Sequence, residues 1–281
     1  VTQLAPAIGA EISGLDLHGP FDAATTEALN QALNEHIVLV FHDQDLDEAS
    51  QIAFSGLFGK VGERARPVER RPEGADYDGA LMLVSNVRDE AGEYIGSLPD
   101  GELWWHHDMS YVAEPHKATV LHALEVPSSG GNTKYSNMYA AYDNLPRALK
   151  DKLAGRNVLQ VYDYHMTIPV DIDQDYSHIR HYTQPIFITH PDTGRTALYV
   201  SRLMSARIDG MDRAESDAIL QDLFGYAEDP AVVYEHQWRV GDVLMWDNYC
   251  SIHARTDFPE SEIRKLRRCT VEGGVAMTAA A

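Results

Sequence analysis

The sequence predicts a β-rich α+β fold, with many short strands forming a sandwich or barrel and a few helices packed outside it. Short apolar runs rich in β-branched residues recur along the 281 residues, and turn residues separate them. Only a few stretches carry the spacing of an amphipathic helix. No internal repeat, low-complexity tract or linker divides the chain, so we expect one domain over residues 1–281.

The first part of the chain predicts helix, strand and helix, followed by a loop. Residues 23–35 (AATTEALNQALNE) carry leucines four apart, and residues 36–41 (HIVLVF) are a short apolar run typical of a buried strand. Residues 50–58 (SQIAFSGLF) again have helical spacing. Residues 63–79 are rich in Arg, Pro, Glu and Gly and have no period, so we expect a mobile loop there.

The rest of the chain predicts strands with two helices between them. Residues 81–84 have the pattern of a strand, and the turn-rich residues 90–101 lead into the next one. Further strands are predicted at 117–123, 132–136, 187–190, 196–201, 237–245, 250–254 and 266–271. The amphipathic stretches 140–153 and 212–224 predict helices outside the β core.

The composition excludes several kinds of partner. The 43 acidic and 23 basic residues give a formal charge of −20, and no run of Lys and Arg could follow a phosphate backbone, so we expect no nucleic acid partner. No stretch approaches the roughly 18 apolar residues of a membrane span, so we expect no membrane partner. Two cysteines and an N-terminal stretch without signal-peptide pattern predict a cytoplasmic protein.

One dense polar stretch, GELWWHHDMS, raises the question of a metal site. In an extended segment His106 and Asp108 project to the same side while His107 points to the other. Two neutral imidazoles and one carboxylate leave three positions open on iron, as an Fe(II) oxygenase requires, and His253 is a candidate for the missing histidine. The alternative is an ordinary hydrogen-bonded His-x-Asp pair in the core or at the surface.

The C-terminal stretch EIRKLRRCTVEG contains a second cluster of polar residues. Arg264 and Arg268 share one strand face with Leu266, whereas Arg267 points away. A buried guanidinium needs an anion, and its planar fork suits a carboxylate, a sulfonate or a phosphate. The alternative is a pair of salt bridges to Asp or Glu residues of the chain.

With these residues, the chain resembles the iron- and 2-oxoglutarate-dependent dioxygenases of the taurine dioxygenase and dichlorophenoxyacetate dioxygenase (TauD/TfdA) group. The likeness runs from about Pro6 to Gly273. Its marks, in order, are Trp105-His106-His107-Asp108, PSSGGNT at 127–133, HPDTGR at 190–195, Gly241-Asp242, Trp246-Asp247-Asn248, His253, Arg264 and Arg268. The resemblance implies a double-stranded β-helix (jelly-roll) core with flanking helices.

The resemblance also implies the cofactors and their residues. His106, Asp108 and His253 would be the catalytic Fe(II) ligands, and 2-oxoglutarate would chelate the metal through its keto acid end. Thr133 and Arg264 would hold its distal carboxylate. Reaction with O2 would release succinate and CO2 and hydroxylate the substrate.

A small anionic substrate is the further implication. Arg268 matches a position that contacts the substrate's anionic group, which predicts a sulfonate, a sulfate ester or a carboxylate such as an aryloxyalkanoate. The intact Asp108 favours hydroxylation over halogenation. Asn86, His107 and Tyr111 are weaker candidates for the substrate pocket, and His107 has the alternative of bracing its loop.

Several expectations stay open at this point. Residues from about 63 to 101 do not align with the substrate loop of the taurine enzyme, and we expect a mobile active-site loop there. Trp104, Trp105 and Trp246 should pack around the site, and the two cysteines should fill core. The resemblance suggests a homo-oligomer, a dimer or a tetramer. Alternatives are desaturation, cyclisation or isonitrile formation in a biosynthetic pathway, and a non-enzymatic β-barrel that binds a small acid.

Overall fold

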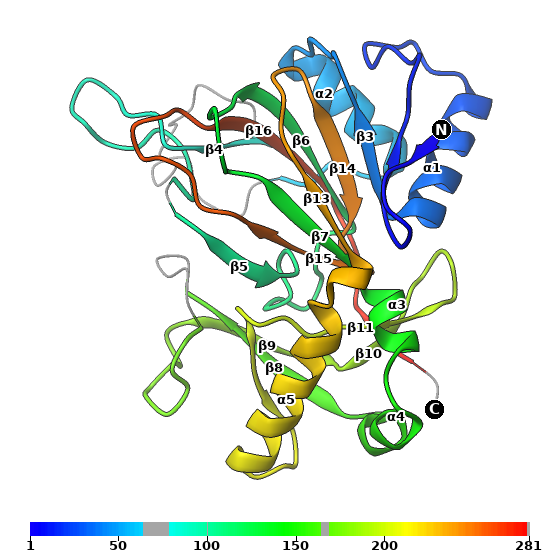
Figure 1. Ribbon diagram of the computed structural model, residues 1–281, viewed down its shortest axis with the longest axis vertical. Helices are drawn as coiled ribbons and strands as arrows, with labels where there is room; N and C mark the ends of the chain where they lie inside the picture. The colour runs from blue at the N-terminus through cyan, green and yellow to red at the C-terminus, as the bar shows by residue number, and fades with distance from the viewer. Residues whose placement is uncertain (64–78, 100, 164–168, 280–281) are drawn as a thin grey trace.

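The computed structural model describes residues 1–63, 79–99, 101–163 and 169–279, and two sheets lie face to face in this part of the chain (Figure 1). The larger sheet has the order β1 (Thr2–Gln3), β2 (Ala10–Glu11), β3 (Val38–Phe41), β14 (Val243–Asp247), β6 (Ala118–Glu125), β16 (Lys265–Val271) and β4 (Leu81–Ser85). The smaller sheet has the order β13 (Val233–His236), β7 (Thr133–Asn137), β15 (Ser251–Arg255) and β5 (Leu103–His106). The molecule is therefore a mixed, sheet-rich fold.

The larger sheet buries both of its faces because its strands carry apolar side chains to each side. On β6, Val120 packs with Phe54 in a cluster that includes residues of both N-terminal helices. Its neighbour Leu121 belongs to the cluster that fills the space between the sheets, together with Tyr135 of the smaller sheet. Inward-facing residues of the two sheets thus meet in one layer, which is where polar residues would be brought together.

Both predicted N-terminal helices are confirmed and cover the outer face of the larger sheet (Figure 1). Helix α1 (Ala23–His36) starts where the Asp22 carboxylate accepts a hydrogen bond from Thr25 N at 2.7 Å. Helix α2 (Glu48–Ser55) starts at Asp47 in the same way, and the 3-10 turn η1 (Gly56–Phe58) extends it.

The remaining elements lie beyond one end of the two sheets (Figure 1). They are α3 (Met138–Asp143), α4 (Arg147–Leu153), β8 (Asn157–Tyr162), β9 (Arg180–Pro185), β10 (Phe187–Thr189), β11 (Thr196–Leu198), β12 (Ser205–Ile208), α5 (Arg213–Ala227), η3 (Pro230–Val232) and β17 (Met277–Thr278). The predicted helix at 140–153 is two helices, since Pro146 lacks the N–H that a continuous helix would need. Strands β8, β9 and β12 were not predicted.

The prediction of one strand over 237–245 is wrong. Strand β13 ends at His236 and β14 begins at Val243, with a turn between them. Gly241 has a φ of +84° in that turn, and Asp242 accepts a hydrogen bond from Arg239 N at 2.9 Å. The turn places β13 and β14 in different sheets, because the chain crosses from one to the other there.

The predicted loop of about 63–101 contains strand β4, as the strand prediction for 81–84 required. Its part at 64–78 and residue 100 lie outside the described residues, and its mobility stays a prediction. Among the residues that the structure describes, no helix is both long and apolar enough to span a bilayer.

Candidate active site

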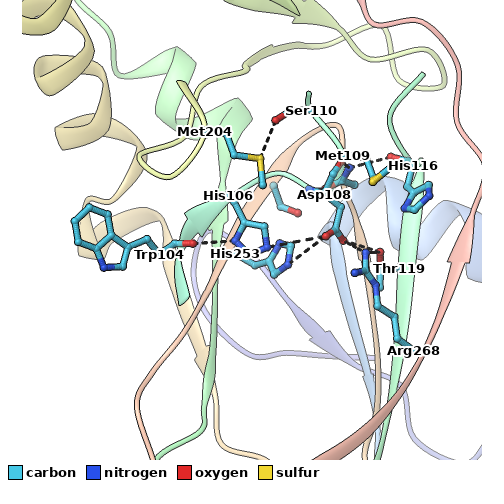
Figure 2. A network of polar contacts seen from close by, with 12 residues as sticks. Trp104, His106, Asp108, Met109, Ser110, His116, Thr119, Met204, His253 and Arg268 are labelled. Atoms are coloured by element: carbon cyan, nitrogen blue, oxygen red, sulfur yellow. Dashed lines mark hydrogen bonds and ion pairs between the residues drawn. The ribbon is translucent and has the colours of Figure 1, made fainter. Parts of the chain in front are cut away.

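The predicted triad comes together between the two sheets (Figure 2). His253 on β15 lies directly opposite His106 on β5, and their ring centroids are 4.1 Å apart. Asp108, two residues beyond His106, places Oδ1 4.0 Å from His106 Nε2 and 3.9 Å from His253 Nε2. All three side chains are buried, and their donor atoms lie within 4.8 Å of one another.

The histidines present the chemical form that a metal requires. The His106 Nδ1 donates to the Trp104 carbonyl at 2.8 Å, which fixes the proton there and leaves the lone pair on Nε2, facing Asp108. Burial lowers the pKa of His106 and lowers that of His253 further, so both rings are neutral at pH 7. A neutral Nε2 on each ring is a metal-ligand atom.

The Asp108 carboxylate is ionised although it is buried. Burial opposes its ionisation, but Arg268 and the two histidines outweigh this effect and hold the pKa of Asp108 well below its usual range. Its second oxygen, Oδ2, lies 2.7 Å from Arg268 Nη2 and accepts a hydrogen bond from Thr119 at 2.8 Å (Figure 2).

The two arginines differ in their partners. Arg268 forms an ion pair with Asp108, as the salt-bridge alternative required, and this partner is itself a residue of the triad. Arg264 is 3% exposed and has no carboxylate partner in the described part of the chain; its Nε donates to the Gly131 carbonyl at 2.9 Å. Burial and the nearby Arg255 lower the pKa of Arg264 to about 9. Arg267 points to the other face, where it donates to Gln51 and the Leu46 carbonyl.

Polar groups of β7 lie near Arg264. Thr133 is buried and accepts a hydrogen bond from Trp238 Nε1 at 2.9 Å. Tyr135 is fully buried, its ring is stacked 6.1 Å from that of His253, and its hydroxyl has no hydrogen-bond partner among the described residues. Arg264 acts electrostatically on Tyr135, although burial is the larger effect and raises the pKa of the tyrosine. Thr133 lies opposite Arg255, which is two residues from His253 on the neighbouring strand β15.

The predicted substrate residues are not gathered at one point. Asn86 bonds the backbone on both sides of Ile263, donating to the Glu262 carbonyl and accepting from Arg264 N. His107 is fully buried with its ring 4.1 Å from that of Tyr199, and neither ring nitrogen has a hydrogen-bond partner among the described residues, so its role stays a prediction. Tyr111 belongs to a small apolar cluster beside β5, shared with Leu103, Tyr162, Leu203 and Met204.

Sequence reasoning missed three residues at the site. Tyr135 lies two residues from Thr133 on the predicted strand 132–136, so period-two alternation could have found it. Arg255 lies two residues from His253 but one residue beyond the predicted strand 250–254. Arg255 donates to the carbonyls of Leu98 and Gly101 and so ties the segment before β5 to β15. Thr119 carried no signal, because a threonine in a buried strand is ordinary.

The aromatic and sulfur residues pack as expected. The Trp246 ring lies 4.7 Å from that of His253, Trp105 packs against the core between the sheets, and Trp104 packs against the small cluster beside β5. Cys250 and Cys269 are both buried and are not disulfide-bonded.

A second group of metal-ligand residue types lies nearby. His190, Asp247 and Cys250 are all buried and close enough to hold an ion. However, His190 Nε2 lies 2.9 Å from Asp247 Oδ2, and His190 Nδ1 accepts hydrogen bonds from two backbone N–H groups. Both ring nitrogens of His190 are already engaged in these hydrogen bonds and are not free to bind a metal, so we interpret this cluster as structural.

Comparisons with known proteins agree with the site. A sequence model of the family "Taurine catabolism dioxygenase TauD, TfdA family" matches residues 1–270. The chain is 32% identical to an alpha-ketoglutarate-dependent 2,4-dichlorophenoxyacetate dioxygenase of Burkholderia sp. (strain RASC), over 96% of this chain and 93% of the relative. It is 32% identical to the pentalenolactone F synthase of Streptomyces avermitilis, over 93% of this chain and 90% of the relative.

A solved structure is also similar. The crystal structure of AAD-2 in complex with Mn(II) and N-oxalylglycine superposes with a TM-score of 0.78 at 30% identity, covering 98% of this chain and 97% of that one. The family model spans nearly the whole sequence, and the predicted resemblance is confirmed. The chain therefore belongs to the TauD, TfdA family and is a 2-oxoglutarate-dependent dioxygenase.

Proposed function

We propose that this enzyme uses Fe(II), 2-oxoglutarate and O2 to hydroxylate a small anionic organic substrate, with release of succinate and CO2. The observation that carries the proposal is the buried triad together with two arginines: Arg268, which pairs with Asp108 of the triad, and the buried Arg264, which has no carboxylate partner among the described residues. Membership of an enzyme family argues against the alternative of a non-enzymatic acid-binding barrel.

The donor set of the triad fits iron. Two neutral imidazoles and one carboxylate form the ligand set of non-haem Fe(II) oxygenases, which leaves three positions open. His106 and His253 are held neutral by burial, and Asp108 is held ionised. When bound, the iron with 2-oxoglutarate would supply the oxidising power for cleavage of a C–H bond.

Arg264 and Thr133 would bind the distal carboxylate of 2-oxoglutarate. A buried guanidinium is stabilised by an anion, and Arg264 Nε is already fixed by the Gly131 carbonyl, which orients the rest of the group. The Tyr135 hydroxyl is a further donor for the same carboxylate, because it is buried near Arg264. These residues would fix the keto acid and exclude water from its far end.

Arg268 would bind the anionic group of the substrate. The named substrates of relatives support sulfonates, sulfate esters and aryloxyalkanoates as the classes to test first.

The proposed core is a double-stranded β-helix. Its support is the path of the chain, which alternates between the sheets: β4, β6, β14 and β16 lie in the larger one, and β5, β7, β13 and β15 in the smaller one. A cytoplasmic location and a dimeric or tetrameric assembly stay predictions from the sequence.

The relative named pentalenolactone F synthase favours a second candidate, a different oxidative outcome at the same site in a biosynthetic pathway. Product mass distinguishes the two, because hydroxylation adds an oxygen atom whereas desaturation removes two hydrogens. A panel of sulfonates, sulfate esters and aryloxyalkanoates, scored by succinate formation and product mass, tests both.

The assignment of the triad has a direct test. Anaerobic addition of Fe(II) and 2-oxoglutarate to the metal-free protein should produce the weak visible charge-transfer band of the chelate. Absence of the band in the wild type, or its persistence in both His106→Ala and His253→Ala, would contradict the proposal.

A further inference from the structure

We propose that Thr119 is a positioning residue that restricts Asp108 to one metal-binding oxygen. When Arg268 binds the anionic group of the substrate, Thr119 would remain as the side-chain donor to the other oxygen. The inference rests on the proposed function, because it concerns how the same triad holds its metal. It assigns to Thr119 a role in keeping a position on the metal open for the keto acid or O2.

The surroundings of Asp108 leave one of its polar atoms unengaged by hydrogen bonds. Asn248 Oδ1 accepts from the Asp108 backbone N–H at 2.7 Å, and Asn248 Nδ2 donates to the Asp108 carbonyl at 2.7 Å. Oδ2 accepts from Thr119 at 2.8 Å and pairs with Arg268 at 2.7 Å. In the described part of the chain, Oδ1 is the atom left to face the two histidines.

Thr119 is held firmly enough to orient a carboxylate. It lies on β6 and is fully buried, with Trp246 of β14 opposite it on one side and Thr270 of β16 on the other. A β-branched side chain in the interior of a sheet has few rotamers to choose from. Its hydroxyl proton is committed to Asp108 Oδ2, and its oxygen is 3.4 Å from Arg268 Nη2 (Figure 2).

The number of oxygens that Asp108 offers matters to the chemistry. A carboxylate can bind a cation through one oxygen or through two. A triad of single donor atoms leaves three positions, enough for a chelating keto acid and O2. If Oδ2 also bound the metal, one of these positions would be lost, so a donor that retains Oδ2 protects the open positions.

Arg268 cannot give this protection throughout the reaction. Its Nη2 contacts both Asp108 and Thr119, and its Nε has no hydrogen-bond partner among the described residues. A substrate anion that uses the planar fork of Arg268 would compete with Asp108 for the guanidinium. Thr119 would then be the remaining side-chain donor to Oδ2, and the two residues should be energetically coupled.

The test uses Thr119→Val, which replaces the hydroxyl by a methyl group of similar size. Co(II) affinity would be measured by anaerobic titration, and 2-oxoglutarate affinity by the Fe(II) charge-transfer band. We expect Thr119→Val to weaken Co(II) binding by about tenfold, as the loss of a hydrogen bond to a metal ligand does. At saturating Fe(II) it should also weaken 2-oxoglutarate binding, because Oδ2 competes for an open position.

Three further variants make the result specific. Thr119→Ser keeps the hydroxyl and should restore both affinities. Thr270→Val removes a hydroxyl at the directly opposite position of β16 and should change neither affinity. At saturating Fe(II), the double variant Thr119→Val with Arg268→Ala should lose more 2-oxoglutarate affinity than the product of the two single losses, because Oδ2 then has neither donor and competes for an open position on the metal.

The outcomes separate the inference from the proposed function. Wild-type affinities in Thr119→Val, a loss that Thr119→Ser does not restore, or strictly multiplicative losses in the double variant would each overturn the inference. Failure of the wild type to bind Co(II), or equal binding by His253→Ala, would instead contradict the proposed function. If Thr119→Val lowers the unfolding temperature of the metal-free protein, the comparison of Thr119→Ser with Thr119→Ala decides in its place.

Discussion

Two buried clusters in this molecule contain nearly the same residue types and differ in what their donor atoms already bind. In the triad, the Nε2 atoms of both histidines and Asp108 Oδ1 face a common point. In the second cluster, His190 and Asp247 bond to each other and to backbone N–H groups. Proximity of ligand residues therefore does not make a metal site; donor atoms left free by their surroundings do.

The strongest way to break this comparison is to remove a ligand from the triad. We expect His253→Ala to lower metal affinity by more than about 100-fold, because loss of a ligand exceeds the loss of a residue behind it. Equilibrium dialysis against Co(II) would measure this, with unfolding of the metal-free protein as the control. Binding at wild-type strength would place the metal elsewhere.

The opposite experiment is His190→Ala in the second cluster. Asp247 would lose its buried partner, and the free energy of unfolding should fall by about 3 kcal/mol. The number of Co(II) ions bound per folded chain should stay the same. A loss of one bound ion without loss of stability would reverse the roles of the two clusters.

His116 lies outside both clusters, and its burial should make the stability of the protein depend on pH. Burial, and then Arg268, lower the pKa of His116 to about 4 from 6.5. Above pH 6.5 the His116 ring is neutral in both the folded and the unfolded protein. Between pH 6.5 and pH 4 the unfolded chain binds a proton at His116 that the folded chain does not bind, so the free energy of unfolding decreases as the pH falls. Its contribution lost between pH 7 and pH 5 is about 2 kcal/mol. Urea unfolding of the metal-free protein at pH 7 and pH 5 would measure this: the free energy of unfolding of His116→Gln should decrease less than that of the wild type. An identical decrease in both proteins would contradict the lowered pKa of His116.

The three arginines Arg264, Arg268 and Arg267 allow a similar comparison between side chains proposed to bind a ligand and one that is already engaged. The expected changes in KM are smaller than the changes above. Arg264→Ala should raise the KM for 2-oxoglutarate by about tenfold, the loss of one charge-assisted hydrogen bond, and Arg268→Ala should raise the KM for the anionic substrate similarly. Arg267→Ala is the matched control, because Gln51 and the Leu46 carbonyl already engage that side chain. It should lower stability and leave both KM values unchanged. Equal effects of all three variants on stability alone would favour a structural role for each.

The sequence predicted the local part of this site and could not predict its assembly. Period-two alternation put His106 and Asp108 on one face, and the two side chains do face each other. It also put Arg264 with Arg268, but Arg264 lies just before β16, whose pairing with β6 is irregular between Lys265 and Leu266. The pairing of His253 with His106 depends on a strand register that no local pattern encodes. The error at 237–245 arose because apolar residues flank a turn at Gly241, and the break at Pro146 could have been predicted from the proline itself.

The register of β5 against β15 determines which residue of β5 faces His253. His106 lies opposite His253, and the next residue along the chain is another histidine, His107. A slip by a single residue turns every side chain of a strand to the other face. The ladder already has one irregularity, between His253 and Arg255, so we expect an insertion next to His106, beyond that irregularity, to turn a ligand away while all three remain in the chain. Transplanting or redesigning this centre consequently requires conservation of strand length before conservation of any single side chain.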